Sequence, residues 1–308
     1  MNTRAPLTIH GLDHVRVLAR DLEAAKDHFR DRLGFAIPPR GSNFGHPLGS
    51  WQTLARFQDA FYLEFLSIKD PERARTGRPE MMAFLERSEG GHSVVLAVPS
   101  ARETSQALLA TGLLANPPVA GSFLPEDDAG PLSAGWWLVN FEHAPFRRET
   151  LSLIEYRQDW AAQTSYARAL PVQPNGVNGA RAVWIAVPDA AAALPQFAAM
   201  GLAPVRRVAW PAMAAIAHEF RVTERQSLLI LEASGAGPTA DFLAARGDAG
   251  VIGVTLTVAS DAPISERAAR LGVTPTWQQG LFGRSLMLPG QCAMGLWLEF
   301  LSGPATAR

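Results

Sequence analysis

The chain has 308 residues, with 28 Lys and Arg against 29 Asp and Glu, and therefore a formal charge of −1. This length suits two domains or one large one, and the near-neutral charge gives no electrostatic reason to expect a nucleic acid or an anionic membrane as partner. Apolar residues make up 47% of the chain and charged residues 19%, which supports a sizeable core and excludes a disordered or fibrous protein.

Four segments of the chain begin in the same way. Each starts with an apolar strand pattern, continues through an Asp or Ser that caps a helical run, and closes the helix with a glycine. The four strand patterns are Leu12–Ala19, His92–Val98, Ala182–Val187 and Val251–Val258. The helical runs are Leu22–Leu33, Ala101–Thr111, Ala190–Met200 and Ile264–Leu271, and the glycines after them are Gly34, Gly112, Gly201 and Gly272.

Each segment also ends alike, on a strand that carries an apolar-Glu-apolar triplet. These strands are rich in Leu, β-branched and aromatic residues, as half-buried strands are. They are Phe61–Leu66, Leu151–Tyr156, Leu228–Ala233 and Leu296–Leu301, and their glutamates are Glu64, Glu155, Glu232 and Glu299. One supersecondary unit is therefore predicted to occur four times.

The spacing within the units indicates a tandem duplication. His14 lies 50 residues before Glu64, and Ala182 lies 50 residues before Glu232. A Pro, Gly and Asn cluster at 173–179 is typical of a linker. We predict an N-terminal domain at 1–172, with units at about 10–68 and 90–158, and a C-terminal domain at 173–308, with units at about 179–234 and 250–302.

A resemblance to a known family rests on the first unit. Residues 11–25 with 32–35 are very similar to the first strand and helix of the vicinal oxygen chelate superfamily, and Tyr62–Phe65 looks like its fourth strand. The superfamily includes glyoxalase-like proteins, extradiol dioxygenases, epimerases and drug-binding or drug-modifying resistance proteins, and the first half most resembles the glyoxalase-like branch. The resemblance implies an α+β fold of four βαβββ units, paired into two open, curved mixed-sheet barrels with helices outside.

The resemblance also implies a divalent metal held by the first strand and the Glu-bearing strand of each unit. In the N-terminal half these positions hold His14, Glu64, His92 and Glu155. In the C-terminal half they hold Ala182 and Val254 (or Gly253), which cannot bind a metal, so the pattern there is degenerate. We therefore expect Glu232 and Glu299 to be mainly structural. A structural ion pair with an inward arginine is the rival role for every one of the four glutamates.

The chemistry depends on how many ligands take part. His14, His92 and Glu155 alone would form a 2-His-1-carboxylate set suited to Fe(II) and O₂. Glu64 as a fourth ligand better suits Zn, Ni, Mn or Co in an isomerase or lyase, with Glu64 or Glu155 as general base next to a carbonyl. We predict the isomerase or lyase on a small, apolar, oxygenated substrate. A ring-cleaving or other Fe(II) dioxygenase and a metal-free binding or sequestering protein are the alternatives.

The direction of His92 is open at the level of sequence. His14 lies seven residues before its helix cap and His92 eight before Ser100, and a slip of one residue turns a strand side chain to the other face. Counted strictly, Ser93 matches His14. A bulge at Gly90 and Gly91 would re-aim His92, as would a longer loop before the helix. We favour an inward His92.

Further side chains are candidates for the mouth of the cup, where they would contact a substrate. They are Asn43, His46, Trp51, Trp137 and Arg148. A core position is the ordinary role for any single aromatic residue among them. Because four units in one chain complete the cup, a homodimer is compatible with the site and is not required for it.

The remaining observations concern the cell compartment. Cys292 is the single cysteine, so the chain forms no internal disulfide and no thiolate-based zinc site. The first residues lack the apolar segment of a signal peptide, and the apolar stretch 180–205 is broken by charges and prolines, unlike a membrane span. We expect a cytoplasmic protein whose partner is a small molecule.

Overall fold

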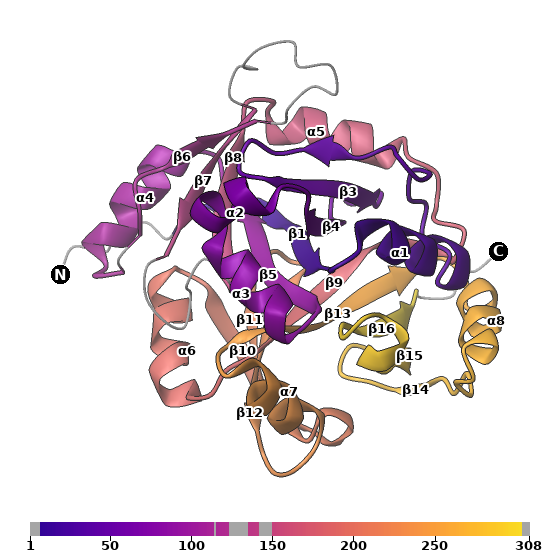
Figure 1. The fold of residues 1–308 in the computed structure, drawn as a ribbon. Coiled ribbons are helices and arrows are strands. Elements are labelled where there is room, and N and C mark those ends of the chain that lie inside the picture. Colours follow the sequence, from indigo (N-terminus) through magenta and orange to yellow (C-terminus); the bar gives the residue numbers. More distant parts are fainter. Residues whose placement is uncertain (1–6, 114, 123–134, 142–149, 304–308) are drawn as a thin grey trace.

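The computed structural model describes residues 7–113, 115–122, 135–141 and 150–303. Two eight-stranded mixed sheets organise these residues, one in each half of the chain (Figure 1). The first sheet consists of β1 (Gly11–Leu18), β2 (Phe44–Gly45), β3 (Ser50–Arg56), β4 (Tyr62–Ile68), β5 (Gly90–Ala97), β6 (Val119–Gly121), β7 (Trp136–Asn140) and β8 (Leu151–Tyr156). The second consists of β9 (Val177–Ala186), β10 (Ala203–Trp210), β11 (Ala215–Arg221), β12 (Ser227–Ala233), β13 (Gly250–Val258), β14 (Gln278–Gln279), β15 (Arg284–Leu288) and β16 (Trp297–Ser302).

The helices lie around the two sheets (Figure 1). They are α1 (Leu22–Asp27), which continues as a π-turn over His28–Arg32, α2 (Pro71–Gly77), α3 (Pro79–Arg87), α4 (Ala101–Ala110), α5 (Trp160–Arg168), α6 (Ala190–Ala199), α7 (Pro238–Arg246) and α8 (Ala262–Arg270). In the described parts of the chain, no helix is long and apolar enough to cross a membrane.

Three of the four helices that open the units begin at a side-chain cap, whereas Asp261 precedes α8 without a side-chain cap hydrogen bond. The side chains of Asp21, Ser100 and Asp189 accept hydrogen bonds from backbone N–H groups three residues later, at 3.0, 3.2 and 3.0 Å. The glycines that close the four helical runs all have positive φ, between +74° and +84°, a conformation that costs glycine little. Local sequence signals therefore set the start and the end of these helices.

The two units of each half join through their first strands. The strand order is β2-β3-β4-β1-β5-β8-β7-β6 in the first sheet and β10-β11-β12-β9-β13-β16-β15-β14 in the second. In each unit the first strand pairs in parallel with the Glu-bearing strand, and the two first strands pair antiparallel at the centre. This is the predicted α+β architecture of four βαβββ units in two curved sheets.

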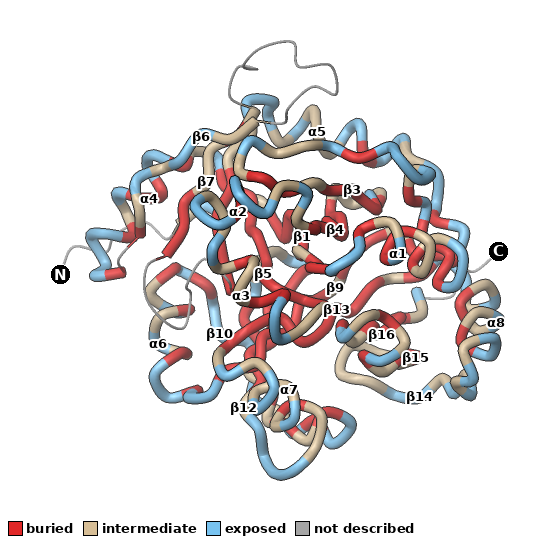
Figure 2. Tube along the Cα trace, viewed as in Figure 1, coloured by how far each residue is buried: buried red, intermediate tan, exposed pale blue. Residues whose placement is uncertain are grey.

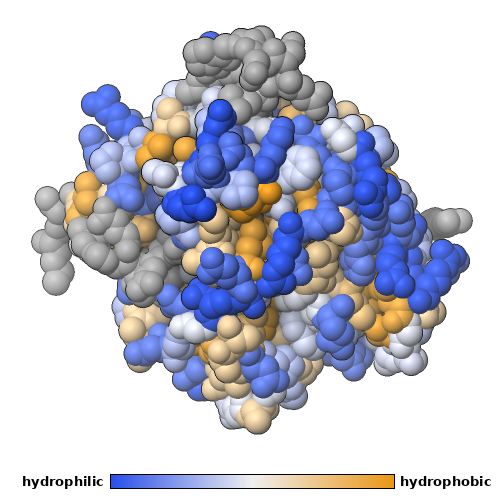
Figure 3. Space-filling view, viewed as in Figure 1, coloured by the Kyte–Doolittle hydropathy of each residue, from blue (hydrophilic) through white to orange (hydrophobic). Residues whose placement is uncertain are grey.

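One continuous hydrophobic core packs the two sheets together. It runs from residues such as Leu12 and Phe65 in the first sheet to Val251 and Leu298 in the second, and buried strands fill the middle of the molecule in Figure 2. β5 and β13 approach closely, since a Cβ at Gly91 would overlap the carbonyl oxygen of Val251. Hydrophilic side chains dominate the face drawn in Figure 3, with hydrophobic ones in narrow strips between them.

The inner face of the C-terminal sheet is filled by side chains. Trp184 of β9 is fully buried there among apolar neighbours such as Trp210 and Met213. Its ring occupies the space over Gly253, where any Cβ would overlap it. The family resemblance implies a ligand position at Val254 or Gly253, and the ring of Trp184 takes the volume that a ligand site at Gly253 would need.

The third unit also differs from the first in its strand register. His14 pairs with Tyr62 across β1 and β4, whereas Ala182 pairs with Ser227 across β9 and β12. The pairing has slid by three residues, and an odd slide exchanges the two faces of a strand. Glu232 accordingly lies at an exposed strand end, 3.2 Å from the Nε2 atom of His218.

Candidate functional site

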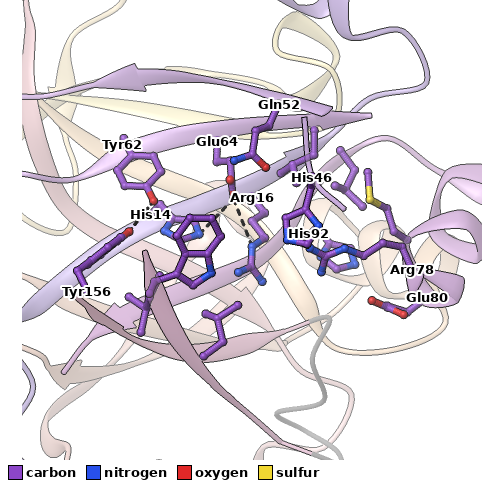
Figure 4. A pocket seen from close by; sticks show the side chains of 16 residues that line it. His14, Arg16, His46, Gln52, Tyr62, Glu64, Arg78, Glu80, His92 and Tyr156 are labelled. Carbon is purple, nitrogen blue, oxygen red and sulfur yellow. Dashed lines mark hydrogen bonds and ion pairs between the residues drawn. The ribbon is translucent and has the colours of Figure 1, made fainter. Parts of the chain in front are cut away.

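A cavity opens on the inner face of the N-terminal sheet (Figure 4). Side chains from both units line it, together with residues from the β2–β3 turn and the start of α3. They are His14, Arg16, Leu18, His46, Gln52, Tyr62, Glu64, Leu66, Arg78, Glu80, Met81, His92, Trp136, Leu138, Ile154 and Tyr156. Its volume of about 60 Å³ holds a few water molecules or a small functional group.

His14 and Glu64 meet at the centre of this cavity. Residues 14, 16 and 18 of β1 and 62, 64 and 66 of β4 alternate into it, as every second residue of a strand faces one side. The Nε2 atom of His14 lies 3.2 Å from Oε2 of Glu64, and its Nδ1 atom lies 2.5 Å from Oδ1 of Asp13. The buried imidazole therefore bridges two carboxylates.

The pKa values of this pair move in opposite directions. Burial lowers the pKa of His14, but attraction to Glu64 and hydrogen bonds to Asp13 and Glu64 outweigh it and raise the pKa above 6.5. Burial raises the pKa of Glu64, but attraction to His14, Arg16 and Arg78 outweighs it and lowers the pKa to about 2. The ionised forms of His14 and Glu64 stabilise each other.

Arg16 presents a guanidinium group to the same cavity. Its Nε atom donates to Oε2 of Glu64 at 3.3 Å, and its η nitrogens make no hydrogen bond to another part of the described chain. Figure 4 shows the side chain between those of His14 and His92. An arginine held at Nε leaves two N–H₂ groups for oxygen atoms of a ligand.

His92 reaches the cavity through a β-bulge. The antiparallel register of β1 and β5 shifts between Arg16–Ser93 and Val17–Gly91, which leaves His92 as the extra residue. Its side chain lines the cavity and makes an edge contact with the ring of Phe84, with centroids 5.1 Å apart. The bulge, one of the explanations open from the sequence, is the one that the structure has.

Two tyrosines extend the polar network toward the outside. The hydroxyl groups of Tyr62 and Tyr156 are 2.8 Å apart, and Tyr156 donates to Oδ1 of Asp13 at 2.8 Å. The ring of Tyr62 stacks on His14 with centroids 4.6 Å apart. Burial raises the pKa of both hydroxyls well above 10, so they act as neutral hydrogen-bonding groups.

The structure does not bring Glu155 to the cavity. Residues 154 and 156 of β8 line it, so Glu155 points to the opposite face. Oε2 of Glu155 accepts a hydrogen bond of 2.7 Å from the backbone N–H of Ala101, the first residue of α4. A carboxylate at a helix N-terminus is a stabilising arrangement, and this is the role that the geometry gives to Glu155.

Of the predicted substrate contacts that the structure describes, some line the cavity and others lie outside it. His46 lines the cavity. Asn43 lies outside it, in hydrogen bonds with Lys26 and Glu23 of 2.8 and 2.6 Å. Trp51 and Trp137 pack against the central core, and the neighbouring residues Gln52 and Trp136 face the cavity instead. Arg148 lies outside the described residues.

The four predicted metal ligands do not converge on one ion. His14 and Glu64 converge as two adjacent ligands would, but among the described residues no three His, Cys, Asp or Glu side chains are placed to hold one ion. The Arg16 guanidinium already contacts the same carboxylate oxygen, and a fixed cation there repels a dication. The described side chains therefore do not fit the metal that the fold family implies.

The sequence matches a known protein family, and the structure matches solved structures. The family model of the glyoxalase-like domain matches residues 12–201, which is more than half of the chain. The chain belongs to the glyoxalase-like domain family. The match spans the N-terminal sheet and continues to the end of α6. No curated protein matches the chain.

Solved structures share the fold of this glyoxalase-like protein at low sequence identity. A hypothetical protein from Staphylococcus aureus is 10% identical, with a TM-score of 0.66 over 95% of this chain and 99% of its own. A mutant 4-hydroxymandelate synthase from Streptomyces coelicolor is 13% identical, with a TM-score of 0.66 over 97% and 93%. The 2,3-dioxygenase LapB from Pseudomonas sp. KL28 is 14% identical, with a TM-score of 0.57 over 99% and 96%. At these identities the likeness shows a shared fold.

Several residues of the glyoxalase-like site were not predicted from the sequence. Arg16 and Tyr62 stand two residues from His14 and Glu64, so strict strand alternation would have found them. Asp13 is adjacent to His14 in sequence and touches it through the ring nitrogen. Arg78 comes from the junction of α2 and α3, where no local pattern indicates a site.

Proposed function

We propose that the N-terminal cup binds a small neutral carbonyl compound with an adjacent oxygen, and moves a proton at the carbon next to the carbonyl. This is isomerase or lyase chemistry. One observation carries the proposal: the guanidinium of Arg16, fixed at Nε by Glu64, presents its η nitrogens to the cavity beside the His14–Glu64 pair. A positive donor group beside a carboxylate is what enolate formation requires.

The charges around the cavity favour a neutral ligand. Two guanidinium groups, the imidazolium of His14 and the carboxylates of Glu64 and Glu80 line the cavity, and the carboxylate of Asp13 contacts His14. An added anion or cation would leave one charge without compensation in a poorly hydrated site. A ketone or hydroxyketone brings hydrogen-bond acceptors and no net charge.

The proposed step transfers one proton. The substrate oxygens accept hydrogen bonds from the η nitrogens of Arg16, and the Glu64 carboxylate takes a proton from the adjacent carbon. The electron pair of the broken C–H bond moves to the carbonyl oxygen, where Arg16 and protonated His14 stabilise the negative charge. The proton then returns to carbon in an isomerase, or a leaving group departs in a lyase.

Substrate binding would also raise the basicity of Glu64. In the free protein His14, Arg16 and Arg78 hold the pKa of this carboxyl at about 2, which makes it a weak base. A substrate oxygen that becomes negative shares the field of Arg16, and so weakens the attraction that holds the pKa down. The basicity of Glu64 therefore rises as negative charge develops on the substrate oxygen during proton removal.

Hydrogen–deuterium exchange at carbon tests the proposal. The neutral hydroxyketone 1-hydroxybutan-2-one is incubated with the protein in D₂O, and loss of its C1 and C3 proton signals is followed by NMR. We expect exchange above the buffer rate for the wild type, and loss of it in Glu64→Gln. Glu232→Gln is the matched control, because Glu232 occupies the corresponding triplet in the third unit and lies on the surface.

A binding or sequestering protein without turnover is the second candidate. It is favoured by the neutralisation of Glu64 by two cations in the free protein. Binding of the hydroxyketone without any exchange would support it over the enzyme. If the wild type neither binds nor exchanges the hydroxyketone, the proposed substrate class is wrong.

Metal dependence is tested in the same assay. We expect EDTA to leave the exchange rate unchanged, and the protein purified without chelators or a His-tag to hold less than one equivalent of Zn, Ni, Mn, Co or Fe. Stoichiometric metal that is lost in His14→Ala would contradict a metal-free site. It would favour the metal-dependent isomerase, lyase or dioxygenase expected from the superfamily.

A further inference from the structure

A second and larger cavity adjoins the first. Its volume is about 770 Å³, within the range of sites that hold drug-sized molecules. It shares the side chains of Tyr62, Trp136 and Tyr156 with the inner cavity and extends from them to α5. These three aromatic residues therefore border both spaces.

The lining of this outer cavity is strongly aromatic. Six of its side chains carry aromatic rings, namely Phe44, Phe57, Tyr62, Trp136, Tyr156 and Tyr166. Phe44 and Tyr166 are 44% and 58% exposed and are among the most exposed large apolar side chains of the described chain. Exposed aromatic residues that gather at one cavity indicate a binding surface.

We propose that the outer cavity is the subsite for an apolar, ring-bearing body of the same substrate whose carbonyl head lies at Arg16. This inference rests on the proposed function and defines its substrate class. The head lies beside His14 and Glu64, and the body extends past the shared side chains to the rings of the outer cavity. The inner cavity alone is too small for more than the reacting group.

Gly121 holds the indole ring of Trp136 in position. It pairs with Trp136 across β6 and β7, and a Cβ at Gly121 would overlap the indole ring. The indole therefore lies directly against the glycine. This close contact fixes the position of Trp136 at the edge of the outer cavity.

Two hydroxyketones with one head group test the inference. The probes are 1-hydroxybutan-2-one and 1-hydroxy-4-phenylbutan-2-one, which differ by a terminal phenyl ring, and the readout is the dissociation constant from ligand-observed NMR or calorimetry. We expect the phenyl compound to bind about 10- to 100-fold more tightly, from burial of one aromatic ring. Equal affinities would overturn the inference.

Two variants and one control test whether the tighter binding of the phenyl probe comes from the outer cavity. Ala167 is buried at the outer cavity and Ala161 is exposed on the same helix. Ala167→Trp fills the subsite and should remove the advantage of the phenyl probe, with the affinity for the short probe unchanged, whereas Ala161→Trp should change neither. Tyr166→Ala, at an exposed position, should reduce the advantage about threefold or more without a risk to folding.

The outcomes separate the two proposals. A phenyl advantage that survives both Ala167→Trp and Tyr166→Ala would overturn the outer subsite. Equal binding of both probes, lost in Arg16→Gln, would also overturn it and leave the carbonyl site in place. Absence of binding by either probe would overturn the proposed function itself.

Discussion

His14, Glu64 and Arg16 form one electrostatic unit at the residue scale. The imidazole lies 3.2 Å from the carboxylate, and the guanidinium Nε lies 3.3 Å from the same oxygen. All three side chains lie at least four-fifths buried. Each ionised group is compensated by its neighbours, so removal of one leaves the others without compensation.

This unit should give the protein a specific pH dependence. The lowered pKa of Glu64 stabilises the fold above pH 4.5, and this stability is lost as the pH falls toward 2. The raised pKa of His14 stabilises the fold below pH 6.5, and this stability is lost as the pH rises through the folded-state value. Both contributions are therefore present between pH 4.5 and 6.5.

Glu64→Gln should accordingly lower the free energy of unfolding most within that window. A loss of about 3 kcal/mol is expected there, as for other broken buried ion pairs, with a smaller difference at either extreme of pH. Urea denaturation at a series of pH values measures it, with Glu232→Gln as the surface control. A difference that is constant with pH would contradict the assigned ionisation.

The hydroxyl group of Tyr156 is a second residue-scale test. It donates to Asp13 at 2.8 Å and contacts the hydroxyl of Tyr62. Tyr156→Phe should cost about 1–3 kcal/mol of unfolding free energy, because a buried carboxylate loses a donor. Tyr166→Phe is the matched control, since this tyrosine is exposed and its hydroxyl should contribute little. Equal effects of the two changes would be inconsistent with the network.

Sequence reasoning reached some residues of the site and missed others for a definite reason. His14 and Glu64 lie on β1 and β4, which pair side by side in the sheet. The apolar patterns of both segments predict strands. For Glu155 and Trp137 the strands were placed correctly, but the face was not. A single residue separates them from Tyr156 and Trp136, which line the cavity, and strand pattern alone does not fix which of two alternating sets is inside.

At the scale of elements, glycines determine how strands approach. Gly91 allows β5 to pack against β13, and the neighbouring bulge turns His92 into the cup. Gly253 makes room for the ring of Trp184 in the C-terminal sheet. Caps and closing glycines were readable from local sequence. The bulge and the three-residue slide of β12 were not, because they depend on contacts between distant strands.

Gly253→Ala should destabilise the C-terminal half. The added methyl group overlaps the indole of Trp184, and overpacking of this kind costs about 1–3 kcal/mol. Thermal denaturation measures the change, and near-ultraviolet circular dichroism reports displacement of the tryptophan. Gly235→Ala is the control, because a Cβ at Gly235 meets no atom within 4 Å. Unchanged stability of Gly253→Ala would show that the ring is free to move.

At the scale of the whole molecule, the two sheets share one core. The hydrophobic cluster runs through both halves, and the side chain of Asp59 in the first half accepts a 2.8 Å hydrogen bond from the backbone N–H of Ala180 in the second. Burial raises the pKa of Asp59 to about 6. The internal repeat made the two-sheet architecture predictable, but the sequence contained no sign of the surfaces through which the halves pack.

Cooperative unfolding follows from this shared core. We expect a single calorimetric transition whose van't Hoff and calorimetric enthalpies agree, because neither half buries its apolar surface alone. The isolated segment 173–308 should accordingly fail to fold. Two resolved transitions in the full chain, or a stable isolated half, would contradict the packing of the two halves as one unit.

A crystal structure of the protein, grown without chelator and soaked with 1-hydroxy-4-phenylbutan-2-one, tests the central claim most directly. The account predicts the hydroxyketone oxygens at the η nitrogens of Arg16 in the N-terminal cup, with the phenyl ring against Tyr166 and Ala167. The C-terminal cup should remain filled by Trp184. A metal ion bound by His14, Glu64 and a third side chain, or a ligand seated elsewhere with the N-terminal cup unchanged, would contradict it.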